Sequence, residues 1–296
     1  MKRIVHILKA SFTVLLLLAA MFQANAQNPI EMPLWPDGPL GSNGLTGDEI
    51  VSEGGIISNV TKPSIIVFRP SNPNGIAIIM CPGGSYVRLA MNHEGLDMAS
   101  WFNTLGITYI ILKYRMPDGH SEIPLSDAEQ AMRLVRAKAA DWGVNPHHVG
   151  IMGASAGGHL AASLATMFTS EETRPDFQIL LYPVISMSPG TTHALSRKEL
   201  IGENASKELE TRYSLEKQVS SRTPQAFIAL SADDGTVPPS NGINYFSALL
   251  EHGVPASLHV YPVGKHGWGF RDSFKYKRQW TGELEKWIFD GLEWND

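Results

Sequence analysis

One serine in the chain has the surroundings of a catalytic nucleophile. Ser155 stands at the centre of Gly153-Ala154-Ser155-Ala156-Gly157, after an apolar run at 149–152 and before a small-residue, helix-like pattern at 159–167. Where a strand, a sharp turn and a helix follow one another, the G-x-S-x-G spacing pushes the serine hydroxyl out toward substrate. Glycines are needed on both sides because strand and helix pass close together there. The pattern therefore predicts that Ser155 is a nucleophile.

A histidine and two aspartates downstream could complete the machinery. A neutral serine hydroxyl is a weak nucleophile and needs an imidazole to accept its proton. His266 lies in a glycine-flanked loop after the last expected strand, a position that favours this role over that of a solvated surface histidine. An acid must hold the imidazole in one tautomer, and Asp233 and Asp234 are both available. The chain order Ser, Asp, His favours catalysis over a coincidental turn around Ser155.

A glycine-rich loop upstream could stabilise the negative charge that develops during acyl transfer. Pro82-Gly83-Gly84-Ser85 closes the apolar run 76–80, and backbone N–H groups aimed at such a charge form an oxyanion hole. We expect Ala156, the residue after the nucleophile, to donate one N–H and Gly84 and Ser85 to donate the others. The usual His-Gly-Gly-Gly motif is altered at both outer positions of this loop, which leaves the donor pair open.

The cysteine and histidine content predicts no disulfide, metal or other cofactor. Cys81 is the single cysteine and we expect a buried, inert thiol, because a Cys81 nucleophile paired with His266 would leave the G-x-S-x-G motif unexplained. The sequence has no H-E-x-x-H motif and no clustered Cys/His spacing, and His147-His148 precedes a strand at the opposite end from the expected site.

Apolar runs alternate with helix-like spacing along most of the chain. The expected strands are 64–69, 76–80, 107–112, 149–152, 177–181, 225–230 and 257–261, and the expected helices are 92–105, 126–143, 159–167, 241–250 and 275–289. This alternation predicts an α/β fold with a mostly parallel central sheet and helices on both faces. Ligands bind beyond the carboxyl ends of such strands, and each candidate catalytic residue falls just past one.

Two segments depart from the alternation. Residues 28–55 are rich in Pro, Gly, Asn and Asp and are expected to form an ordered but irregular lead-in. Residues 186–223 separate two expected strands by more than a simple connection needs, and long inserts are often functional lids. We expect a small, lid-like helical insert over the site, with a plain surface excursion as the alternative.

The first 26 residues are typical of a secretory signal peptide. Lys2, Arg3 and Lys9 give a positive start, residues 10–22 are uncharged and apolar, and Ala24-Asn25-Ala26 fits a cleavage site. The apolar stretch is short for a membrane anchor, and no nearby cysteine is available for lipid attachment. We therefore expect a secreted or periplasmic protein without stable membrane insertion, with residues 27–296 forming a single domain.

Net charge argues against a nucleic-acid partner. The formal charge of the 296-residue chain is −5, and removing three basic residues with the signal peptide makes the mature chain more negative. A negative surface repels the phosphate backbone.

Taken together, these residues resemble the α/β-hydrolase superfamily, and within it the small secreted acetylxylan esterase-like and carbohydrate esterase-like hydrolases. The matching segments are Cys81-Pro82-Gly83-Gly84-Ser85-Tyr86, His93-Glu94-Gly95, Lys113-Tyr114-Arg115, 153–159, Tyr182-Pro183-Val184, Ala232-Asp233-Asp234 and Lys265-His266-Gly267. The resemblance implies an α/β-hydrolase fold and a serine ester hydrolase that removes acetyl or other small acyl groups from xylan-type poly- or oligosaccharide through an acyl-enzyme.

The resemblance also bears on individual residues. In the family two residues separate the catalytic acid from a Val-Pro pair, which favours Asp234 over Asp233 and leaves Asp233 to accept hydrogen bonds from turn amides. Aromatic residues beside the motifs could line a sugar-stacking pocket or could simply pack in the core: Tyr86, His93, Tyr182 and Trp268. Alternative functions are a general carboxylesterase for small esters, a peptidase, and a non-catalytic carbohydrate-binding homologue.

Overall fold

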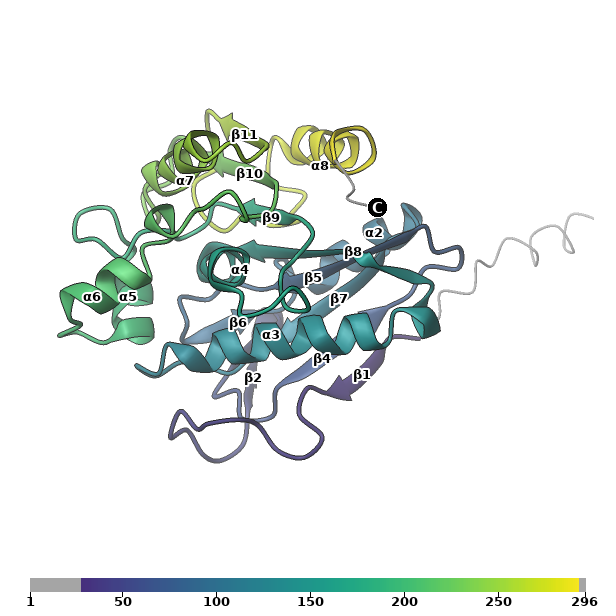
Figure 1. Ribbon diagram of the computed structural model, residues 1–296, viewed down its shortest axis with the longest axis horizontal. Coiled ribbons are helices and arrows are strands. Elements are labelled where there is room, and N and C mark those ends of the chain that lie inside the picture. The colour runs from purple at the N-terminus through teal and green to yellow at the C-terminus, as the bar shows by residue number, and fades with distance from the viewer. Residues whose placement is uncertain (1–27, 293–296) are drawn as a thin grey trace, which may run out of the picture.

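An eight-stranded sheet forms the centre of the computed structural model, which describes residues 28–292 (Figure 1). The strand order is β1-β4-β7-β5-β8-β9-β10-β11. Every neighbouring pair from β7 to β11 is parallel, whereas β1–β4 and β4–β7 are antiparallel. The strands are β1 (Ile30–Pro33), β4 (Ser64–Phe68), β5 (Gly75–Cys81), β7 (Thr108–Lys113), β8 (Val144–Ala154), β9 (Gln178–Leu181), β10 (Ala226–Ser231) and β11 (Ala256–Tyr261).

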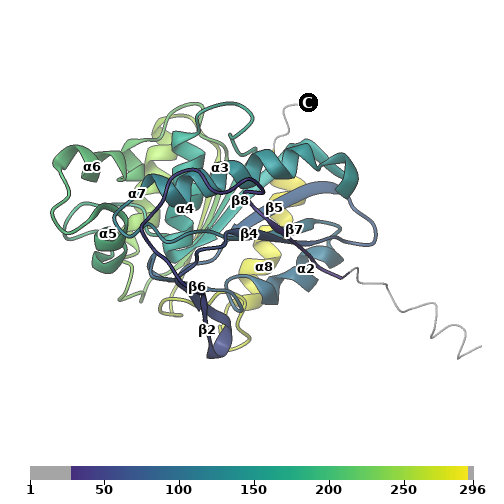
Figure 2. The ribbon, with the colours of Figure 1, turned by 90° about the horizontal axis from the view of Figure 1, so that it is seen from below.

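Helices cover both faces of this sheet, so the predicted fold class is confirmed. One face carries α3 (Glu122–Ala137), α4 (Ser155–Met167) and α7 (Ser240–Glu251), and the other carries α2 (Ala99–Thr104) and α8 (Lys277–Lys286) (Figure 2). A π-helical turn, Trp287–Gly291, continues α8. Because both faces are covered, β5 and β7 are buried along nearly their whole length, and β8 is buried from Val149 to Ala154. No helix among residues 28–292 combines the length and the apolar content needed to cross a bilayer.

The lead-in is more regular than expected. Its first residues form β1 on the edge of the main sheet, and β2 (Ile50–Ser52) begins a second sheet with β3 (Ile56–Ser58) and β6 (Arg88–Ala90). A 3-10 turn, Glu53–Gly55, joins β2 to β3. The strand β6 comes shortly after the glycine-rich loop 82–85 and pairs with β3, which pairs with β2 of the lead-in. This small antiparallel sheet therefore holds the lead-in beside the expected site.

Several predicted helices have different boundaries; α4, for example, begins at Ser155 and not at His159. Only a 3-10 turn, Leu96–Met98, and α2 form within 92–105, because Gly95 has a non-helical backbone. The helix expected from Ser126 begins four residues earlier, with Pro124 in its first turn, where the missing N–H costs nothing. It ends at Ala137, and a separate 3-10 turn, Ala140–Trp142, follows.

The segment 186–223 includes helices, whereas its lid-like role stays a prediction. It contains α5 (Ala194–Ile201), α6 (Lys207–Arg212) and a 3-10 turn, Leu215–Lys217. These helices lie together at one end of the molecule (Figure 1). The side-chain amide of Asn241 on α7 donates to the carbonyl of Thr191, which lies within 186–223. This insert is therefore anchored to α7, the helix that follows β10.

The predicted signal peptide, residues 1–26, lies outside the described residues.

Candidate active site

Ser155 occupies a strained turn between β8 and α4. Its φ angle is 54°, in the left-handed region that L-residues with a side chain rarely adopt. A Cβ on Gly153 would collide with the backbone of Gly157, and one on Gly157 would collide with the carbonyl oxygen of Cys81. The two flanking glycines are therefore required for strand, helix and the neighbouring β5 to approach this closely.

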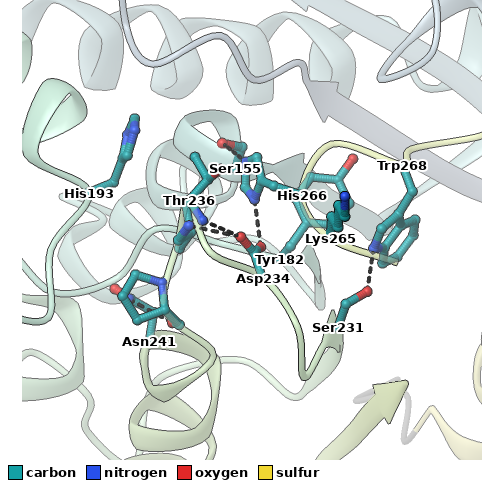
Figure 3. Close-up of polar contacts among 12 residues, drawn as sticks. Ser155, Tyr182, His193, Ser231, Asp234, Thr236, Asn241, Lys265, His266 and Trp268 are labelled. Atoms are coloured by element: carbon teal, nitrogen blue, oxygen red, sulfur yellow. Dashed lines mark hydrogen bonds and ion pairs between the residues drawn. The ribbon is translucent and has the colours of Figure 1, made fainter. Parts of the chain in front are cut away.

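Ser155, His266 and Asp234 form a continuous hydrogen-bonded chain (Figure 3). The Nε2 atom of His266 lies 2.8 Å from the Ser155 Oγ, and its Nδ1 atom lies 2.6 Å from Oδ2 of Asp234. The imidazole is carried by the loop after β11, and the carboxylate by the loop after β10. Three side chains from separate strand ends thus converge at the carboxyl edge of the sheet.

The donors and acceptors available at these three residues determine where the protons of His266 and Ser155 lie. A carboxylate can only accept, so Nδ1 of His266 carries a proton and donates it to Asp234. In a neutral imidazole, Nε2 then has a free lone pair that accepts from the Ser155 hydroxyl. The arrangement is ready to remove the proton from Ser155 during nucleophilic attack.

The two adjacent aspartates have different contacts. Asp234 has a side chain that is only 1 % exposed, and its second oxygen, Oδ1, accepts from the backbone N–H groups of Thr236 and Val237 at 2.9 Å each. Asp233 instead accepts from the N–H of Lys265 at 2.8 Å, which holds the loop that carries His266. The geometry places Asp234, and not Asp233, against the imidazole.

The glycine-rich loop leaves two expected donors without a partner. The N–H of Gly83 donates to Glu94, and the carbonyl of Pro82 accepts from the Tyr114 hydroxyl at 2.7 Å. Within the described part of the chain, the N–H groups of Gly84 and Ser85 have no hydrogen-bond acceptor. Ala156 lies in the first turn of α4, where helical geometry supplies none either. All three predicted oxyanion donors therefore have N–H groups that remain available.

Three of the four aromatic residues proposed to line a sugar-stacking pocket have no open ring face. Tyr86, Tyr182 and Trp268 are at most 4 % exposed, and their polar atoms bond to His159, Glu94 and Ser231 respectively. They pack in the core beneath the site. Core packing was the alternative to a sugar-stacking pocket for these aromatic residues.

The fourth residue of that group, His93, is half-buried beside Arg271, whose guanidinium lies 3.2 Å from the ring. It keeps some contact with solvent.

His193 borders the site although no sequence motif indicated it. It directly precedes α5, and its Nδ1 lies 2.8 Å from the Ser196 hydroxyl. Burial lowers the pKa of His193, and the charge of His266 lowers it further. Figure 3 shows His193 in the same close-up as the triad. The insert therefore contributes a residue to the surroundings of His266.

Cys81 has no route to act as a nucleophile. Its side chain is fully buried, and burial raises the pKa of the thiol well above its ordinary value, so the thiolate does not form near neutral pH. No group of three or more potential metal-ligating side chains occurs among residues 28–292.

A second buried histidine, His159, links the nucleophile helix to the glycine-rich loop. Its Nε2 must donate to the Tyr213 carbonyl, 2.9 Å away, so its Nδ1 accepts from the Tyr86 hydroxyl, also at 2.9 Å. Burial lowers the pKa of His159 from 6.5 to about 4, and the bond to Tyr213 only partly offsets this. The ring is neutral at pH 7. Its position one helical turn after Ser155 was the available sequence signal, but spacing alone does not indicate burial.

This histidine predicts a loss of stability in mild acid. Below pH 6.5 the unfolded chain protonates His159 whereas the folded chain does not until about pH 4, so the free energy of unfolding falls as pH falls through this window. The contribution is roughly 1.4 kcal/mol per pH unit, or about 2 kcal/mol between pH 6.5 and 5. Urea denaturation at pH 7 and pH 5 should show a smaller fall for His159→Gln than for the wild type. Equal falls would contradict the assignment.

The chain is similar to known proteins both in sequence and in structure. A family model described as alpha/beta hydrolase fold matches residues 79–270, which include the glycine-rich loop and all three triad residues. Among solved structures, an acetyl ester-xyloside bifunctional hydrolase from Caldicellulosiruptor lactoaceticus superposes with a TM-score of 0.77 at 34% identity, covering 90% of this chain and 97% of that one.

Two curated relatives are similar over most of the chain. An acetylxylan esterase of Xylanibacter ruminicola is 43% identical over 236 residues, which cover 78% of this chain and 49% of the relative. Endo-1,4-beta-xylanase B of Butyrivibrio fibrisolvens is 35% identical over 204 residues, which cover 64% of this chain and 32% of the relative. The chain thus spans half or less of the length of these relatives.

Proposed function

Because the chain belongs to the α/β-hydrolase family, we propose that it is a serine ester hydrolase that removes acetyl or other small acyl groups from xylan-type poly- or oligosaccharide. The observation that carries the chemistry is the hydrogen-bonded chain from Ser155 through His266 to Asp234. The substrate class is supported by the names of three relatives, which refer to acetylxylan, to xylan and to an acetyl ester and xyloside.

The proposed reaction has two steps. The Ser155 oxygen attacks the acyl carbon while Nε2 of His266 takes the hydroxyl proton, and Asp234 stabilises the resulting imidazolium. The carbonyl oxygen becomes negative and is bound by the N–H groups of the oxyanion hole. The imidazolium then protonates the departing sugar oxygen, which leaves an acyl-enzyme. Water, deprotonated by the same imidazole, attacks this ester and releases the carboxylic acid.

The oxyanion donors that we propose are the three with available N–H groups, Gly84, Ser85 and Ala156. The loop that contains the first two lies against the nucleophile, since a Cβ on Gly83 would come 2.9 Å from the Cβ of Ser155.

We also propose that the protein is exported and acts outside the cytoplasm, because residues 1–26 have the composition of a cleaved signal peptide. An extracytoplasmic location would give the enzyme access to polymeric carbohydrate.

Acetate release from defined substrates tests the proposed specificity. We expect acetylated xylo-oligosaccharides to be deacetylated with a kcat/KM at least about tenfold above that for 4-nitrophenyl acetate, because the sugar adds binding energy that remains in the transition state. Acetate can be measured by an enzyme-coupled assay. Efficient hydrolysis of the aryl ester together with negligible acetate release from the oligosaccharide would favour a general carboxylesterase.

A phosphonate that labels activated serines separates catalysis from mere carbohydrate binding. We expect one covalent adduct, located at Ser155 by mass spectrometry, because His266 activates that hydroxyl. Folded protein that binds acetylated xylan but never forms this adduct would support a non-catalytic binding function.

A further inference from the structure

Glu94 is a buried carboxylate that the proposed reaction steps do not use. The residue is 3 % exposed. Its Oε2 accepts from the N–H of Gly83 at 2.9 Å, and its Oε1 accepts from the hydroxyl of Tyr182 at 2.8 Å. Within residues 28–292 no lysine or arginine pairs with it, and the one nearby basic ring, that of His93, is 3.9 Å away. Burying a carboxylate with so little positive charge nearby is costly, so stability alone is a poor explanation for it.

Tyr182 extends this contact to the loop that carries the catalytic histidine. Its hydroxyl accepts from the N–H of Gly269 at 2.8 Å while it donates to Glu94. Its ring packs edge-on against His266, with 4.9 Å between ring centroids, and against Trp268 at 4.5 Å. One carboxylate therefore joins the glycine-rich loop on one side of Ser155 to the His266 loop on the other.

We propose that Glu94 is a positioning residue that holds the oxyanion loop and the His266 loop in register with each other. Its contact to Gly83 immediately precedes the two proposed oxyanion donors, Gly84 and Ser85, so the direction of their N–H groups depends on it. Its hydrogen bond to Tyr182 holds the ring that packs against His266. The inference rests on the proposed ester hydrolysis, since it concerns the geometry of that reaction.

Hydrogen-bond chemistry explains why a carboxylate is needed here. The N–H of Gly83 is a donor, and the Tyr182 hydroxyl must also donate because its oxygen already accepts from Gly269. Two converging donors require two acceptors, which a carboxylate supplies and a carboxamide does not. Glu94→Gln keeps the shape of the side chain but sets its NH₂ group against a donor.

Tyr182→Phe is the most direct test because it removes only the hydroxyl. We expect kcat for 4-nitrophenyl acetate to fall about tenfold with KM changed less than about twofold, since misplaced oxyanion donors weaken binding of the transition state more than that of the substrate. The matched control is Tyr245→Phe. Tyr245 is also fully buried, and its hydroxyl donates to Gln178 at the amino end of β9, away from the site. This control should lose a similar few degrees of Tm and keep kcat within about twofold.

Glu94→Gln should lower kcat about 10- to 100-fold, because it disrupts one or both contacts. In the double variant with Tyr182→Phe, the combined loss should be smaller than the product of the single losses, since both changes break the same connection. Independent, multiplicative losses would contradict the proposal, and so would a rise in KM with kcat unchanged. If Glu94→Gln does not fold, the comparison of the two tyrosine variants decides alone.

Hydrogen exchange tests the connection without relying on turnover. Compared with Tyr245→Phe, Tyr182→Phe should increase amide exchange in peptides covering both 82–90 and 262–270. Faster exchange in only one of these loops, or in neither, would overturn the inference. A wild-type protein that hydrolyses no ester would instead contradict the proposed function, and the exchange experiment would still report on Glu94.

Discussion

Replacing Ser155 by alanine is expected to lower kcat for acetate release by about 10⁴- to 10⁶-fold while leaving the fold intact. The hydroxyl is the only group at the elbow that can form the acyl-enzyme, and it lies 2.8 Å from the base that activates it. What remains should come from the oxyanion hole and substrate binding. The strained backbone at Ser155 is equally available to alanine, so the Tm should change by no more than a few degrees. Initial rates with acetylated xylo-oligosaccharide measure the effect.

A serine on the same helix provides the matched control. Ser163 is buried in α4, and within residues 28–292 its hydroxyl has one hydrogen bond, a long one of 3.4 Å to His159. Ser163→Ala should therefore keep kcat within about threefold. The double variant Ser155→Ala with His266→Ala should be scarcely slower than Ser155→Ala alone, because the two residues act as a unit. A Ser155→Ala protein that retains more than about 1% of wild-type kcat would rule out this nucleophile.

The fold was predictable where local pattern and tertiary environment agree. The strand β5 was expected from an unbroken apolar run, and in the structure it is buried on both faces between β7 and β8. The start of α3 was not predictable in this way. Ser126 has the residue type of a helix cap, but its hydroxyl bonds to the carbonyl of Ile123 inside the helix, which begins at Glu122 with Pro124 in its first turn.

The hydrogen-bonded arrangement of Ser155, His266 and Asp234 was easier to predict than its surroundings. The turn at Ser155 needs Gly153 and Gly157 because the backbone segments pass too close together for a Cβ. The spacing of these two glycines can be read directly from the sequence. The direction in which Tyr86 or Trp268 points is set by partners distant in sequence, His159 and Ser231. Adjacency to a motif therefore indicated a role in the pocket for residues that pack beneath it.

The contacts of Glu94 were also not predictable from sequence patterns. The sequence places it within a segment typical of the family, yet its contact with Tyr182, 88 positions later, depends on the packing of two loops. No periodicity or spacing records such a contact.

Replacing Asp234 by asparagine is expected to lower kcat by about 10⁴-fold. The Oδ2 atom of Asp234 lies 2.6 Å from Nδ1 of His266 and keeps the proton on that nitrogen. An asparagine that turns its NH₂ toward the ring would favour the other tautomer, in which Nε2 carries the proton and cannot accept one from Ser155. The substitution also removes the negative charge that stabilises the imidazolium. Stopped-flow or steady-state hydrolysis of 4-nitrophenyl acetate would measure the loss.

Asp233→Asn is the matched control for this prediction, because the same substitution one residue earlier should have only a small effect on kcat. Asp233 bonds to the N–H of Lys265, and an asparagine oxygen can still accept from that group. Asp233→Asn should therefore retain kcat within about tenfold, with the remaining loss due to a looser His266 loop. The reverse ranking, in which Asp233→Asn is the more damaging change, would assign the triad acid to Asp233. Equal and small losses would mean that neither carboxylate controls the tautomer of His266.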